Sequence, residues 1–212
     1  MRRILLRSDS KEEKMNKTKS LDTRKLVLLA LLTAIVVVLQ LMASILPIYP
    51  FTLTLVLVPI VIGASLIGIP AGVWLGLVFG FVVLVTPPQA TLFLAWSAPL
   101  TILVVLLKGG LAGLASGAVY KLLAKKSKTI AVILAAIVCP LVNTGIFVLG
   151  SYAFFLQYIA EWGAGLGFES ATTLIFFGFI GINFPLELII NIVLSPSIVR
   201  LIQYGQNKKV TA

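Results

Sequence analysis

Residues 26–46, LVLLALLTAIVVVLQLMASIL, form an apolar run without a charged side chain, and Pro47 ends it. The run matches the roughly 20 apolar residues needed to cross the hydrocarbon core of a bilayer. Backbone groups in lipid must find hydrogen-bond partners within the protein, so a run of this length predicts a transmembrane helix. Similar apolar runs follow along the chain at residues 52–67, 70–86, 91–123, 129–156 and 174–204.

The composition of the whole chain also indicates a membrane protein. Hydrophobic residues make up 59% and charged residues 11%, whereas soluble globular proteins carry roughly 25% charged residues. The short alternating segments of a transmembrane β-barrel are absent from the sequence. We therefore expect an all-α membrane protein with a transmembrane domain at residues 24–204. It is preceded by a polar segment at residues 1–23, expected to be disordered and cytoplasmic, and followed by a cytoplasmic tail at residues 205–212.

The basic residues predict the orientation. Nine of the 17 lysines and arginines precede the run at 26–46, four lie between Lys121 and Lys128, and three close the chain from Arg200. Treating 91–123 as one span puts all of these on one side, and basic residues mark the cytoplasmic side. The opposite loops, 47–51, 87–91 and 157–173, contain no basic residue. The sequence thus predicts six helices with both termini cytoplasmic, and a loop or short helix within 91–107 that caps the outer face.

Polar residues inside the spans are the candidate functional residues, since charges in a membrane are costly and usually functional. Lys108 and Glu187 each lie 13 residues from the basic residue that ends their span, and Asn143 lies 15 residues after Lys128. At about 1.5 Å per residue, all three sit roughly 20 Å above the cytoplasmic boundary. Asn183 and Asn191 share a helix face with Glu187, because they are four residues away on either side.

Two interpretations of these residues stay open. In one, Lys108 and Glu187 form a buried pair that only holds helices together, with Asn143 as an interhelical hydrogen-bonding residue. In the other, they line a solute cavity, which we favour because a buried ion pair gains little stability after desolvation. Trp96 and Tyr152 are candidates for the apolar walls of such a cavity, although aromatic residues are common near membrane interfaces.

The residues required for several other activities are missing from the sequence. There is no G-x-x-x-x-G-K-[ST] loop for nucleotide phosphates, no H-E-x-x-H, no G-x-S-x-G and no histidine. We expect no catalytic residue, no metal site and no cofactor. The chain is also short for an autonomous secondary transporter, and it contains no convincing internal repeat of the kind such transporters use.

Small residues recur at four-residue spacing, which creates flat helix faces that another backbone can approach closely. Packing within the chain is the simpler explanation for them, and docking to a partner membrane subunit is the alternative. The three sets are Ala30 and Ala34; Gly72, Gly76 and Gly80; and Gly109, Gly113 and Gly117.

Residues 24–204 resemble the substrate-binding S components of energy-coupling factor (ECF) vitamin transporters. The likeness rests on the order of loose motifs, the six-helix count and the size. These motifs are Ala30-Leu-Leu-Thr-Ala34, Phe51-Thr-Leu-Thr54-Leu with Pro59-Ile-Val-Ile-Gly63 and Ile69-Pro-Ala-Gly72, Lys108-Gly-Gly-Leu-Ala-Gly113, and Pro140-Leu-Val-Asn143-Thr-Gly145. Two of these segments, residues 140–145 and residues 51–54, are most similar to the pantothenate-type members. S components for folate, a pyridoxine precursor or riboflavin are the alternatives.

The resemblance implies a multi-pass protein of a bacterial plasma membrane that captures a vitamin from outside. The S component would then associate with a transmembrane T component, through Ala30 and Ala34, and with two ATP-binding subunits that hydrolyse ATP. Lys108 would pair with the pantothenate carboxylate, while Asn143, Asn183, Asn191 and Thr54 would contact its polar groups. Glu187 would neutralise Lys108 in the empty site. A structural or assembly subunit is the alternative from another class.

Overall fold

The computed structural model describes residues 2–45, 55–86, 90–181 and 183–207, and the side chains of 23–44, 55–86, 90–181 and 184–200. Every regular element in these ranges is a helix, as predicted, and η1 and η2 are π-helical segments. The elements are α1 (Arg2–Ile45), α2 (Leu57–Leu66), α3 (Ile69–Val85), α4 (Thr91–Leu123), α5 (Lys128–Gly150), η1 (Ser151–Phe155), α6 (Leu156–Gly165), α7 (Ala171–Thr173), η2 (Leu174–Ile180) and α8 (Asn183–Asn207).

Four helical stretches of the described chain are long and apolar enough to cross a membrane, and α2 and α3 add two shorter apolar helices. The predicted bundle of six membrane helices is confirmed. Large apolar side chains such as Leu122, Phe177 and Phe81 are more than half exposed on its outer surface, as is suitable for a surface in lipid. The four long stretches are Thr23–Ser44, Thr91–Leu123, Lys128–Gly165 and Ala171–Arg200.

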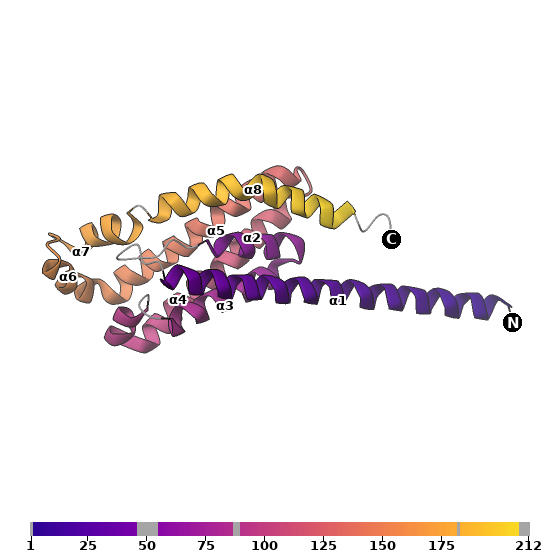
Figure 1. Cartoon of the computed structure of the whole chain (residues 1–212), viewed down its shortest axis with the longest axis horizontal. Helices are drawn as coiled ribbons and strands as arrows, with labels where there is room; N and C mark the ends of the chain where they lie inside the picture. The colour runs from indigo at the N-terminus through magenta and orange to yellow at the C-terminus, as the bar shows by residue number, and fades with distance from the viewer. Residues whose placement is uncertain (1, 46–54, 87–89, 182, 208–212) are drawn as a thin grey trace.

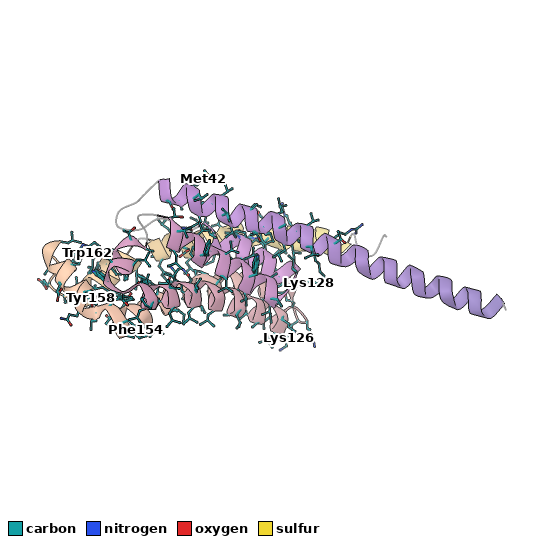
Figure 2. All side chains as sticks on the ribbon, turned by 90° about the horizontal axis from the view of Figure 1, so that it is seen from below. Met42, Lys126, Lys128, Phe154, Tyr158 and Trp162 are labelled. Carbon is teal, nitrogen blue, oxygen red and sulfur yellow. The ribbon has the colours of Figure 1, made fainter. Side chains whose placement is uncertain are left out.

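The two ends of the bundle differ in character. Both chain termini lie at one end and α6 and α7 at the other (Figure 1). Lys126 and Lys128 lie toward the end with the termini, whereas Tyr158 and Trp162 lie at the opposite end (Figure 2). This arrangement agrees with the predicted grouping of the basic residues on one side of the membrane.

Two predicted boundaries differ from the structure, and of the loop or short helix expected within 91–107 the short helix is present. The outer loop expected at 157–173 is largely helical, since α6 continues to Gly165 and buries Ile159 and Gly163. The span expected at 174–204 is interrupted at Gly181, whose φ of +20° is rarely adopted by residues with a side chain. The extra segment expected within 91–107 is a short helix that ends at a kink at Ser97, two residues before Pro99.

At the start of the chain, α1 begins at Arg2 and so runs through the segment 1–23 that was expected to be disordered. Only the backbone is described before Thr23, and the disorder of this segment stays a prediction. From Thr23 onward α1 lies against the bundle, where the Trp74 indole donates a hydrogen bond to the Thr33 hydroxyl at 3.2 Å.

Glycines bring α3 and α4 into backbone contact. A Cβ added to Gly72 would lie 2.7 Å from the carbonyl oxygen of Gly113. One added to Gly76 would overlap the carbonyl oxygen of Gly109. The two predicted glycine faces therefore pack against each other inside the chain. We call this contact the glycine seam; it consists of Gly72 and Gly76 on α3 with Gly109 and Gly113 on α4.

The buried residues form two hydrophobic clusters. The larger is mostly aliphatic and joins α1, α2, α3, α4, α5 and α8, with Leu57, Ile60 and Leu75 fully buried. The smaller gathers aromatic and aliphatic side chains from α4, η1, α6 and η2, among them Phe93 and Phe155. A cavity lies where these two clusters meet.

Candidate functional site

A cavity of about 110 Å³ lies inside the bundle and takes its walls from both hydrophobic clusters. One water molecule needs roughly 10–15 Å³ of such space, so the cavity has room for several waters or a small organic molecule. Its apolar wall is dominated by phenylalanine side chains from α3, α4, α5, η1, η2 and α8, namely Phe79, Phe93, Phe147, Phe155, Phe179 and Phe184.

Lys108 brings a positive charge to this cavity from α4, one residue before the glycine seam. Its ammonium nitrogen lies 5.5 Å from the centre of the Phe79 ring and 5.4 Å from that of Phe147. Such cation–π contacts stabilise a cation that has lost part of its hydration. The seam fixes the neighbouring backbone of α3 and α4, which positions both the Lys108 stem and the Phe79 ring.

Glu187 brings a carboxylate to the same cavity from α8. Its side chain is only 6% exposed, and it is close enough to Lys108 for an electrostatic interaction. Removing two charges from water is costly, and their mutual attraction offsets that cost only in part. The cavity wall thus carries one cation and one anion with no net charge between them.

Asn143 of α5 is the third predicted residue that the structure brings to this cavity. It is 6% exposed, and its Oδ1 has no hydrogen-bond partner within the described part of the chain. Buried polar atoms without a partner are rare in proteins and require an explanation. An N–H or O–H group of a bound solute would supply the partner that this oxygen lacks.

The other predicted site residues lie elsewhere or are not described. Asn191 is fully buried one turn beyond Glu187, and its side-chain amide donates to the Glu187 carbonyl at 2.9 Å rather than lining the cavity. Asn183 begins α8, but its side chain is not described, and Thr54 lies outside the described residues.

The two predicted aromatic wall residues stand behind the cavity wall. The Trp96 ring lies 5.0 Å from the Phe93 ring, edge to face, and stacks on Tyr158 at 5.6 Å. Tyr152 is partly buried against the same aromatic cluster. Neither lines the cavity itself. They pack around the rings that do, so an effect on a bound solute would be indirect.

Sequence reasoning missed several lining residues. The polar ones are Thr101, Thr144 and Ser151, and the phenylalanines form most of the remaining wall. A detectable signal existed on α5 and η1, where polar and aromatic residues alternate every four positions: Asn143, Phe147, Ser151 and Phe155. Phenylalanine in an apolar helix carries no such signal, because lipid, a core and a cavity all accept it.

In a comparison with protein-family models, residues 24–199 match the family described as ECF transporter, substrate-specific component. Neither the curated proteins nor the solved structures returned a match. The matched range covers all or nearly all of each membrane span and contains all residues described as lining the cavity. The predicted resemblance is confirmed at the level of the family, which consists of non-catalytic membrane transport subunits. The chain therefore belongs to the substrate-specific (S) components of ECF transporters.

Proposed function

We propose that this S component captures a small vitamin from outside the cell in the cavity between α3, α4, α5 and α8, and that pantothenate is the first candidate. The observation that carries the proposal is the convergence of Lys108, Asn143 and Glu187, from three helices, on one phenylalanine-lined cavity. The matched family supports the transport role but names no substrate.

A solute explains these side chains better than a purely structural role. A Lys–Glu pair that only joined helices would need no space beside it, and a hydrophobic replacement would often be equally stable. Here the pair borders a cavity, and the Asn143 Oδ1 beside it lacks a partner within the described chain. Both features are typical of a site whose contacts are completed by a ligand.

Pantothenate suits this combination of groups. Its carboxylate would pair with Lys108, its hydroxyl or amide hydrogens would be donated to the Asn143 Oδ1, and its two methyl groups would contact phenylalanine rings. Glu187 would compensate the charge of Lys108 while the site is empty.

We further propose that the chain works in a bacterial plasma membrane with a transmembrane T component and two ATP-binding subunits. ATP hydrolysis by those partners would reorient the whole S component and release the vitamin inside. Ala30 and Ala34 are the candidate docking residues, since both are exposed on α1. Large exposed apolar residues flank them, including Leu31, Ile35 and Val38.

The proposal is tested by binding to the purified full-length chain. Radiolabelled pantothenate should bind with a stoichiometry of about one, and unlabelled pyridoxine, riboflavin and folate should compete more weakly. Lys108→Ala should weaken pantothenate binding by roughly 10- to 100-fold, as expected for a hydrogen bond to a charged group. It should weaken binding of a neutral pantothenate amide much less.

Lys121→Ala is the matched control, because Lys121 lies on the same helix but is exposed outside the cavity. It should leave binding unchanged. If none of the four vitamins bound the wild-type chain, the proposed capture function would be wrong and the alternative of a structural subunit would gain support.

A further inference from the structure

Ser151 places a hydroxyl group in the cavity wall that no predicted contact uses. It is the first residue of the π-helical segment η1 and is 1% exposed. Its Oγ has no hydrogen-bond partner within the described part of the chain, although it lines the cavity. π-Helical turns occur frequently at functional sites, so this combination of features warrants an explanation.

Ser151 is one of three buried serines, with Ser65 and Ser116, whose Oγ has no hydrogen-bond partner in the described chain, and of the three it alone lines the cavity. In an apolar environment a serine or threonine hydroxyl commonly donates to the carbonyl four residues earlier in its own helix. Five hydroxyls of the described chain do so at 2.6–2.9 Å: Thr33 to Leu29, Ser44 to Gln40, Thr86 to Val82, Thr101 to Ser97 and Ser195 to Asn191. The Ser151 hydroxyl makes no such bond to the carbonyl of Phe147, four residues earlier, within the described chain.

Ser151 and Asn143 mark two separate polar points along the cavity. They are eight residues apart on one face of the same helical stretch, which corresponds to roughly 12 Å along the axis. Between them lies Phe147, whose ring faces the Lys108 ammonium. Thr101, another hydroxyl in the wall, already donates to the carbonyls of Phe93 and Ser97 at 2.7 and 2.8 Å.

The surroundings of the two points differ in charge. Glu187, which interacts electrostatically with Lys108, also interacts with Cys139, one helical turn before Asn143. Ser151 is flanked along its own helix by the rings of Phe147 and Phe155, and the next residue before it, Gly150, packs closely against Val104. A hydroxyl in such an apolar wall suits a neutral hydrogen-bonding group and disfavours an ionised one.

We propose that Ser151 is a specificity-determining residue that binds a neutral hydrogen-bonding group, a hydroxyl or an amide, at the end of the ligand opposite the charged group held by Lys108. The inference rests on the proposed function. With Ser151 in this role, the cavity selects elongated ligands that have one charged end, one uncharged polar end and an apolar middle beside Phe147. In pantothenate the uncharged end is the terminal hydroxyl.

Equilibrium binding to the full-length chain tests this assignment. The probes are pantothenate and a deoxy analogue whose terminal hydroxyl is replaced by hydrogen. Ser151→Ala should weaken pantothenate binding roughly five- to tenfold, the usual range for one lost hydrogen bond. The same substitution should leave binding of the deoxy analogue unchanged, because that molecule lacks the group that Ser151 would bind.

Ser116→Ala is the matched control. Ser116 is fully buried on α4, and its Oγ also lacks a partner within the described chain, but it does not line the cavity. It should leave the affinity for both probes unchanged. The thermal unfolding midpoint of each variant checks that any loss of affinity comes from the site and not from misfolding.

The outcomes separate this inference from the function on which it rests. Equal pantothenate affinity of wild type and Ser151→Ala would overturn the role of Ser151 and leave vitamin capture intact. An equal loss for pantothenate and the deoxy analogue would also overturn it, since Ser151 would then act through packing alone. Failure of pantothenate, pyridoxine, riboflavin and folate to bind the wild-type chain would overturn both proposals.

Discussion

Helix α4 takes part in two regions with opposite packing, a close helix–helix contact and a cavity. From Gly109 to Gly113 it touches α3 backbone to backbone, and no side chain fits between the two helices. Within the turns just before, from Thr101 to Lys108, the same helix lines a cavity. On α3 the close contact also gives way to the cavity within three residues, since Gly76 belongs to the seam and Phe79 lines the cavity.

The difference between the glycine seam and the cavity shows how a small membrane protein can combine closely packed helices with an internal cavity. Association of helices in lipid depends on close packing, because lipid tails are as apolar as the helices themselves. The glycine seam supplies such packing next to the cavity. Large aromatic side chains then hold the neighbouring turns apart, so that polar groups can face a space that packing has not filled.

The largest expected effect comes from breaking the seam itself. Gly76→Ala would place a Cβ against the backbone of Gly109, so the helices would have to separate. We expect a loss of about 4 kcal/mol or more, which is exceptional for a single substitution. Thermal unfolding of the purified chain, followed by tryptophan fluorescence, would measure it.

Gly145→Ala provides the control for this substitution. It lies on α5 with no atom within 4 Å of an added Cβ, so it should be neutral or stabilise the helix by up to about 1 kcal/mol. Equal unfolding midpoints for the two alanine variants would show that the seam is not the close contact described here.

A smaller effect is expected from the charges in the cavity region. Lys108→Met leaves the Glu187 carboxylate buried without its opposite charge, which should cost about 3 kcal/mol of stability. Adding Glu187→Leu should recover most of that stability, because the uncompensated charge is gone. Pantothenate binding should be weakened in both variants by at least the roughly 10- to 100-fold expected for Lys108→Ala. The measurements are unfolding midpoints and ligand titrations on the same preparations.

A recovery of binding together with stability in the double variant would contradict the cavity assignment. It would mean that Lys108 and Glu187 only join helices, as the glycines of the seam do. The separation of stability from binding is therefore what distinguishes the two regions of α4 experimentally.

The smallest effect on the isolated chain is expected at Ala30 and Ala34, the exposed small-residue pair on α1. Ala34 is exposed on α1, so Ala34→Leu should change the unfolding free energy by no more than about 0.5 kcal/mol and leave vitamin binding intact. Vitamin uptake by cells that express the whole transporter should nevertheless fall, because leucine would obstruct the proposed T-component contact. Unchanged uptake would argue against docking through this face.

Sequence reasoning went furthest where a single physical requirement acts on each residue by itself. The run at 26–46 has to be a helix because lipid offers its backbone no partners, and the other five spans follow by the same argument. Counting residues from the basic loops was enough to place Lys108, Asn143 and Glu187 at one level, since the rise of a helix is constant. The structure brings these three side chains to one cavity.

The same reasoning was weaker for residues whose role depends on their neighbours. Asn191 shares a helix face with Glu187, yet its amide bonds the backbone of its own helix. Trp96 has the character of a wall residue but packs one layer outside the wall. The interruption at Gly181 was missed, because a glycine in an apolar run does not reveal its φ value.

Apolar length and basic-residue placement by themselves determined that this chain is a six-helix membrane protein and which ends of its helices lie together. Each of these properties depends on one segment and its solvent, so no knowledge of the other segments was needed. Only the tertiary structure decided which small residues pack against each other, which hydroxyls find a partner and where space is left open. Those properties depend on pairs of surfaces from distant parts of the chain, and a linear pattern does not specify how two surfaces meet.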